Sequence, residues 1–152
     1  MRTFLNVKKT VFSNLDHVYP EVFSARPIET PREELDHKKG RKINVKIKFH
    51  DYDGYLQCKE IFEGDELIEY YYDWYAGNKE ILQKFHAHYH RDETPHEFKK
   101  FDPWHVHVPM KLEDKDGQRI EGVPGYTIHD VLSNHIIPYI LKMRRSQRQR
   151  GN

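Results

Sequence analysis

Two kinds of hydrophobic spacing alternate along the chain, and each predicts a different element. Apolar residues recur at helical spacing over residues 3–18, and again after Thr127, where the stripe runs from Ile128 to Met143. Between these segments apolar and polar residues alternate with a period of two, which is typical of half-buried strands. The pattern therefore predicts a helix, then a series of strands, then a second helix.

Five strands are predicted, because turn signals rich in Asp, Gly and Asn separate the alternating segments. Their approximate ranges are 42–49, 55–62, 67–75, 81–90 and 104–108. Short turns between consecutive strands favour antiparallel pairing. The expected fold class is therefore α+β: an antiparallel meander of about five strands flanked by an N-terminal and a C-terminal helix, with the helices packed on one sheet face.

The length of 152 residues fits a single domain with its own core. We expect this domain over residues 1–143, with a proline-containing loop at 20–40 and a basic flexible tail at 144–152. Thr127 is a good N-cap, with Asp130 placed to complete a capping box. Pro138 should kink or split the C-terminal helix, since it removes a hydrogen bond one turn back.

Composition and charge indicate the cellular compartment of the protein and the kind of partner that it binds. No segment approaches the roughly 20 apolar residues of a membrane span, and lysines interrupt the N-terminal segment where a secretory signal is apolar. The single cysteine, Cys58, cannot form an internal disulfide, which suits a reducing compartment. Residues 38–48 carry six positive charges and no negative one. We therefore expect a cytoplasmic protein, without membrane contact, whose basic surface favours an anionic partner.

Histidines are concentrated in one window, residues 84–109, which holds six of the eleven. Side chains two apart on a strand share a face and lie about 6.5–7 Å apart. Five of the six would share faces in this way: His86, His88 and His90 on one strand, and His105 and His107 on the next. If the two strands pair, up to five imidazoles converge, with Asp73 and Asp102 within reach.

Acid–base catalysis is the first interpretation of this cluster. One imidazole can accept a proton while another donates one near neutral pH. Cleavage of RNA needs this pairing, with cations to stabilise the charge on the phosphorus group, and it needs no cofactor. The candidate catalytic residues are His86, His88, His105 and His107, with Tyr72 to position the substrate. The candidate phosphate-binding residues are Lys84, Lys99, Lys100 and Arg91 nearby, and Lys46 and Lys48 on the basic strand.

Two further interpretations stay open. A His-x-His pair on a strand presents two nitrogens to one ion, and another histidine or a carboxylate can complete the site. A divalent metal such as zinc would then be held by residues from the set His86, His88, His105, His107 and Asp102, in a metal-dependent hydrolase or nuclease. Alternatively, the histidines are polar surface residues, and the protein is a non-catalytic protein-interaction module.

The order of the motifs resembles the TumE-like toxin family of prokaryotic toxin–antitoxin systems. The resemblance covers roughly residues 43–140. It rests on Tyr70, Tyr72, Asp73 and Trp74, then on His86 with His88 or His90, then on His105 and His107. It implies a small cytoplasmic toxin, neutralised by a cognate antitoxin protein, that acts on RNA. The leading expectation is a metal-independent endoribonuclease; assembly into a homo-oligomer stays open.

Overall fold

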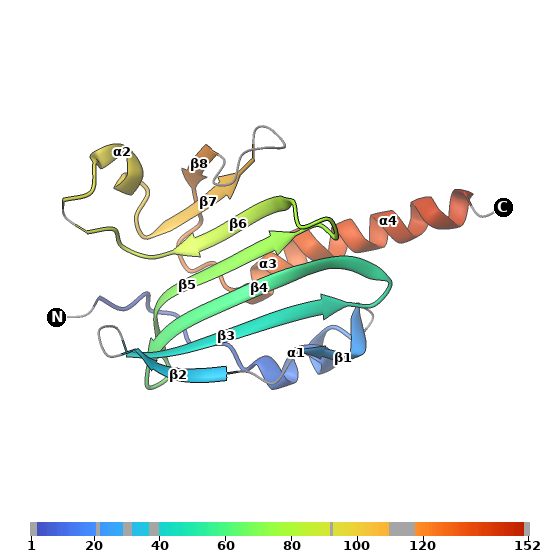
Figure 1. Ribbon diagram of the computed structural model, residues 1–152, viewed down its shortest axis with the longest axis horizontal. Helices are drawn as coiled ribbons and strands as arrows, with labels where there is room; N and C mark the ends of the chain where they lie inside the picture. The colour runs from blue at the N-terminus through green and yellow to red at the C-terminus, as the bar shows by residue number, and fades with distance from the viewer. Residues whose placement is uncertain are drawn as a thin grey trace.

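The computed structural model describes residues 3–20, 22–28, 32–36, 40–91, 93–109 and 118–150. Within them, the chain forms an antiparallel sheet of eight strands (Figure 1). A meander makes up most of the sheet, each strand pairing with the next: β3 (Gly40–Phe49), β4 (Tyr52–Glu63), β5 (Glu66–Tyr75), β6 (Ile81–Ala87), β7 (Trp104–Val108) and β8 (Gln118–Glu121). The predicted α+β class and the meander are confirmed, and β8 is one strand more than expected.

Two further strands lie one after the other along the outer edge of β3. β2 (Arg32–Asp36) pairs with the first half of β3 and β1 (Phe23–Ile28) with the second half, both antiparallel. The prediction of a loop over residues 20–40 is wrong for these two segments. Proline is tolerated on an edge strand, where an outward N–H has no ladder partner, so Pro27 does not prevent β1 from pairing.

The N-terminal helix is much shorter than the predicted range of 3–18. The backbone N–H of Leu5 donates to the Leu67 carbonyl, and the N–H of Leu67 donates to the Val7 carbonyl, both at 2.9 Å. This segment therefore lies along the start of β5, because pairing with the sheet satisfies backbone groups that a helix would otherwise satisfy. Helical structure is confined to a 3₁₀ turn, Phe12–Asn14, and α1, Leu15–Val18.

The C-terminal helical region consists of α3 (Ile128–Val131), a π-helical turn η2 (Leu132–Ile136) and α4 (Ile137–Arg150). The predicted capping box is present: the Thr127 N–H donates to Asp130 Oδ2 at 2.8 Å. Pro138 has no N–H to offer the carbonyl four residues back, which favours the wider turn before it. The predicted break at Pro138 takes the form of this π-helical turn, within a region that stays helical from Ile128 to Arg150. The predicted flexible tail is wrong, since α4 continues through residues 144–150.

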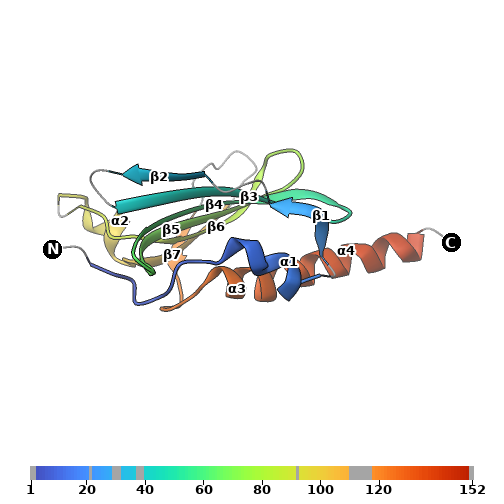
Figure 2. The ribbon, with the colours of Figure 1, turned by 90° about the horizontal axis from the view of Figure 1, so that it is seen from below.

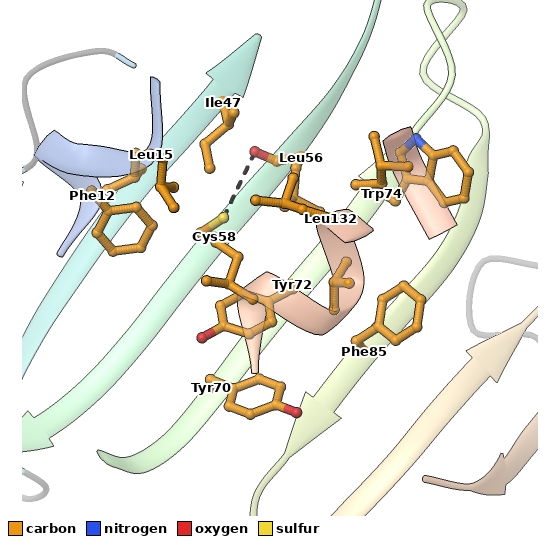
Figure 3. Packing of buried hydrophobic residues seen from close by; sticks show 14 of the residues in the cluster. Phe12, Leu15, Ile47, Leu56, Cys58, Tyr70, Tyr72, Trp74, Phe85 and Leu132 are labelled. Atoms are coloured by element: carbon orange, nitrogen blue, oxygen red, sulfur yellow. Dashed lines mark hydrogen bonds between the residues drawn. The ribbon is translucent and has the colours of Figure 1, made fainter. Parts of the chain in front are cut away.

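The helices α1, α3 and α4 lie on one face of the sheet (Figure 2). Buried side chains from β3, β4, β5 and β6 meet them there, among them Ile47, Leu56, Tyr72 and Phe85 (Figure 3). Among the described residues, no helix crosses the middle of the opposite face (Figure 2). No helix in the described part is long and apolar enough to cross a membrane.

Glu60 is a carboxyl group buried on the helix-covered face. The N–H and hydroxyl of Thr10 donate to it, the N–H at 2.9 Å, and the Tyr72 hydroxyl donates at 2.5 Å. Burial, the largest effect, raises the pKa of Glu60 above its ordinary value of 4.5, and these hydrogen bonds act in the opposite direction. The folded state therefore binds a proton on Glu60 more readily than the unfolded chain does.

This raised pKa predicts a pH-dependent stability. The contribution of Glu60 is fully present below the unfolded pKa and is lost as pH rises through the folded pKa. Glu60→Gln keeps the shape and removes the titration, so its free energy of unfolding relative to wild type should increase with pH above about 4.5. Urea unfolding between about pH 4 and pH 8 measures this. The exposed Glu93→Gln control should follow wild type, and parallel profiles for Glu60→Gln and wild type would contradict the prediction.

Candidate histidine centre

Alternation along β6 and β7 places the histidines on the sheet face opposite the helices. On β6, Phe85 is buried towards the helices, so the adjacent His86 lies on the other face. In the ladder, His86 is directly opposite His105, and Lys84 is directly opposite His107. The expected pairing of the two strands is therefore confirmed, and His86, His105 and His107 share one face. The predicted strand over 81–90 is too long, because β6 ends at Ala87 and His88 and His90 lie in the connection that follows it.

The chain that connects β6 to β7 folds back over His105. The His88 N–H donates to the Pro103 carbonyl at 2.9 Å. The ring centroids of His88 and His90 lie 4.8 and 5.7 Å from that of His105. Five imidazoles thus form one cluster, here called the histidine centre: His86, His88, His90, His105 and His107. The sixth histidine of the window, His96, is exposed on α2 (His96–Lys99).

Carboxylates fix two of these rings. Asp73 Oδ1 accepts a hydrogen bond from His86 Nε2 at 2.7 Å. Asp102 accepts from the His90 backbone N–H at 2.7 Å and from His90 Nδ1 at 2.6 Å. A carboxylate that accepts the proton of one ring nitrogen leaves a lone pair on the other. His86 therefore presents Nδ1 as an acceptor, and His90 presents Nε2.

His105 is a fully buried residue of the centre, only 3% exposed. Its Nδ1 donates to the Pro103 carbonyl at 3.2 Å, whereas Nε2 is buried without a hydrogen-bond partner in the described part of the chain. Burial, then the neighbouring imidazoles, lower the pKa of His105 to about 3. The ring is therefore neutral near pH 7 and cannot act there as a general acid. The lone pair on its Nε2 is available to an ion.

Three histidines of the centre lie close enough together to form a candidate metal site. One nitrogen each from His86, His105 and His107 lies within 4.8 Å of the other two. Zinc binds imidazole nitrogen at about 2.0–2.1 Å, which separates tetrahedral ligands by roughly 3.4 Å, so modest ring rotations would close the site. The carboxylate on His86 and the carbonyl on His105 are the partners that orient metal-bound histidines in proteins.

The predicted metal-ligand set is larger than this group. Asp102 binds His90 instead of approaching the three nitrogens. His88 stacks on Tyr71, with ring centroids 5.0 Å apart and planes 25° from parallel. The structure thus reduces the five predicted ligands to three, and leaves His88 and Asp102 beside the site rather than in it.

Tyr72 is not at this site, and the prediction that it positions the substrate is wrong. It is 1% exposed, and its ring stacks on Tyr70 among the core residues, with centroids 4.2 Å apart (Figure 3). Tyr71 takes the predicted place, with its ring centroid 4.8 Å from that of His86. Strand parity could have found it in the sequence, because Tyr71 and Asp73 are two apart and must share a face.

The predicted phosphate-binding residues lie in three places. Lys84 is inside the ladder beside the histidine centre, opposite His107 on one side and Asp73 on the other. Three others belong to the connection between β6 and β7: Arg91, Lys99 and Lys100. The last two, Lys46 and Lys48, are on β3, three strands and therefore roughly 14 Å from β6.

The register links the distant lysines to the centre through two rows of side chains on the open face. One row is Lys59, Tyr71, His86 and His105; the other is Lys46, Gln57, Asp73, Lys84 and His107. Two lysine ammonium groups lie over tyrosine rings: Lys46 4.2 Å from the Tyr55 centroid and Lys59 4.7 Å from the Tyr71 centroid. Lys59 was missed in the sequence, because its place in a row depends on the register of β4 against β5.

Comparison with known proteins adds no relative. No family model, no curated protein and no solved structure matches the chain. The functional argument therefore rests on the geometry of the histidine centre and of the face around it.

Proposed function

We propose that the protein is a metal-dependent endoribonuclease in which His86, His105 and His107 hold a divalent transition metal such as zinc. The observation that carries the proposal is the buried, unpartnered Nε2 of His105, in a group of three histidines whose nitrogens converge. An ion at this point would satisfy the nitrogen that the described protein groups leave without a partner. Three imidazoles and an open fourth position form the ligand set of catalytic zinc sites.

The neighbouring residues suit the chemistry of RNA cleavage. The metal would act as a Lewis acid towards a phosphate oxygen. His90, held through Nδ1 by Asp102, has its Nε2 lone pair available to take the proton of the RNA 2′-hydroxyl. The O2′–P bond then forms while the P–O5′ bond breaks, and the leaving O5′ takes a proton from water. Lys84 supplies positive charge beside the centre.

The open sheet face supports RNA as the substrate. Tyr55 stacks on Tyr75 and Tyr71 stacks on His88, and each tyrosine ring has a lysine ammonium group over it. A base would stack on these tyrosines by displacing the lysine, whose charge would then contact a phosphate. Lys48 adds a further exposed charge on β3. The face leads along the two side-chain rows to the histidine centre, so a single strand bound there would reach the metal.

The toxin assignment is part of the same proposal. The residues that carry the resemblance to the TumE-like family fall into two groups. The histidines belong to the histidine centre, where Asp73 binds His86, whereas Tyr70, Tyr72 and Trp74 pack in the core beneath it. The motif thus includes both the residues of the proposed site and the core residues that hold the strands in place, which supports a shared activity. We infer a cytoplasmic toxin acting on cellular RNA, with an antitoxin protein that covers the open face; a homo-oligomer is compatible with this.

A second candidate is metal-independent cleavage by the same histidines. The His90–Asp102 pair favours it, because a histidine oriented by a carboxylate is the usual arrangement of a general base. His105 cannot supply the general acid in that scheme, so the donor would have to be another group of the centre.

EDTA separates the two candidates. We expect the purified protein to contain about one zinc-class ion per chain and to cleave a mixed-sequence RNA. Cleavage should stop on removal of the ion and return with one added metal. Metal content is measured by mass spectrometry and products by gel electrophoresis. Full cleavage by protein shown to be metal-free would select the metal-independent scheme. Bound metal without cleavage of any RNA would reject the nuclease and leave an interaction module with a metal site.

A further inference from the structure

A cavity of about 180 Å³ lies on the helix-covered side of β6 and β7. The residues that line it include Tyr70, Phe85, Trp104, Val106, Tyr126 and His135, together with positions of β6 and β7 that belong to the histidine centre, His86 and His105. An engineered protein cavity of about 150 Å³ admits benzene, so this one has room for a single aromatic ring with small substituents.

The wall is flat and aromatic on one side. The rings of Phe85 and Tyr126 are within 14° of parallel, with centroids 6.2 Å apart. The His135 ring lies beside them, 4.7 Å from the Phe85 centroid. Flat ring faces and edges pack best against another planar group, because the quadrupoles of aromatic rings favour offset and edge-to-face contacts. The shape therefore favours a planar ligand over a bulky aliphatic one.

Hydrogen-bond donors remain for such a ligand. Asn134 donates to Tyr126 Oη at 3.2 Å, and Tyr126 Oη lies 2.7 Å from His135 Nε2. Burial lowers the pKa of His135, so the neutral ring accepts from Tyr126 and carries its proton on Nδ1. In the described part of the chain, neither this Nδ1–H nor the indole N–H of Trp104 donates to another protein group, and both residues line the cavity. Neither nitrogen is among the buried atoms left without a partner, so both reach solvent, and a ligand with acceptors would take the place of water at these two donors.

The backbone supplies an independent observation. His135 lies in the π-helical turn η2. Such turns are rare in proteins as a whole, but those that occur are often found at functional sites. Pro138 explains why the helix widens here, and the widened turn places His135 in the cavity wall. The histidine centre is on the opposite face of the sheet and uses neither residue.

We propose that this cavity is a binding site for a small planar aromatic compound that carries hydrogen-bond acceptors. The occupant is a free molecule rather than the phenylalanine side chain of a partner protein, because a phenyl ring offers no acceptor to His135 and Trp104. His86 and His105 of the histidine centre also border this cavity, but strand alternation directs their rings towards the opposite face of the sheet. The test of the cavity therefore involves neither RNA nor metal.

Nicotinamide is a suitable probe, with a pyridine nitrogen and an amide oxygen as acceptors. The chain has two indole N–H groups that NMR resolves individually: that of Trp104 in the cavity wall, and that of Trp74, which donates to Tyr52 Oη at 3.2 Å. Titration should shift the Trp104 signal with a dissociation constant of about 0.1–1 mM, as expected of so small a ligand, and leave the Trp74 signal in place. Cyclohexanecarboxamide, of equal size but not planar, should bind at least about tenfold more weakly.

Val106→Phe fills the cavity from β7 and should abolish the shift, whereas the same substitution at the exposed Val11 should leave it unchanged. The Trp74 signal reports whether each variant is folded. The proposal is overturned if nicotinamide gives no shift at millimolar concentration, if the shift persists in Val106→Phe, or if cyclohexanecarboxamide binds equally well. It is also overturned if only phenylalanine-containing peptides bind, since the occupant would then be a partner's side chain.

Discussion

Replacing His105 with alanine should lower the affinity for zinc by more than about 100-fold. Removal of a partner that only orients a ligand costs about 10–100-fold, and His105 is proposed as a ligand itself. RNA cleavage should fall in parallel, because the ion would lose one of its three proposed ligands, the buried Nε2 of His105. The measurement is competition for zinc against a chelator of known affinity, followed by cleavage assays on the same preparations.

Two further variants make this result specific. Asp73→Asn keeps the side chain's size but weakens its hold on His86 Nε2, and should give an intermediate loss of about 10–100-fold in zinc affinity. His17→Ala, at an exposed position outside the centre, should bind zinc as wild type does. Wild-type zinc affinity in a folded His105→Ala variant would contradict the metal site, whatever the outcome of the RNA assays.

The adjacent tyrosines of β5 should give opposite results when each is replaced with alanine. Tyr72→Ala should lower the free energy of unfolding by about 3–5 kcal/mol, the usual cost of removing a buried aromatic ring. It also removes the hydroxyl that donates to Glu60. Tyr71→Ala, on the open face, should cost much less stability and should weaken RNA binding by about 5- to 150-fold, since a stacked base contributes about 1–3 kcal/mol.

Urea unfolding and fluorescence anisotropy with a labelled RNA strand measure these two effects. Metal-free protein is the right sample for anisotropy, because the strand then stays intact under the proposed mechanism. If Tyr72→Ala lost RNA affinity while retaining full stability, the assignment of the two faces would be wrong. If Tyr71→Ala bound RNA as tightly as wild type, the open face would not be the RNA surface.

Alternation was enough to predict the middle of the fold. A period of two in β3 to β7 gives both the strands and the shared face of His86 and His105, because side-chain parity is a local property of a strand. The N-terminal segment and the edge strand β1 were not predictable in the same way. Leu5 and Val7 fit a helical stripe, but hydrogen bonds to Leu67 decide their structure, and nothing local encodes that partner. β1 likewise depends on the long-range pairing with β3.

In the candidate site, too, the local features were predictable from the sequence and the tertiary contacts were not. Histidine spacing predicted the cluster, and Asp73 and Asp102 were expected nearby. Which nitrogen each ring presents could not be predicted, because the Pro103 carbonyl and the two carboxylates set it through tertiary contacts. The error at Tyr72 had another cause: both faces of β5 carry tyrosine, so composition alone does not distinguish the core ring from the surface ring.

Strand β7 has a two-sided composition, with His105 and His107 towards one face and Trp104 and Val106 towards the other. The effect of a one-residue insertion or deletion therefore depends on its position. Around residues 93–97, away from the part of the connection that holds His90, Asp102 and Pro103, it changes only the length of a surface segment. Between Trp104 and His107 it would exchange the two faces, placing an indole among the proposed metal ligands and an imidazole in the aromatic cavity. Natural length variation should thus be frequent around residues 93–97 and excluded within 104–107.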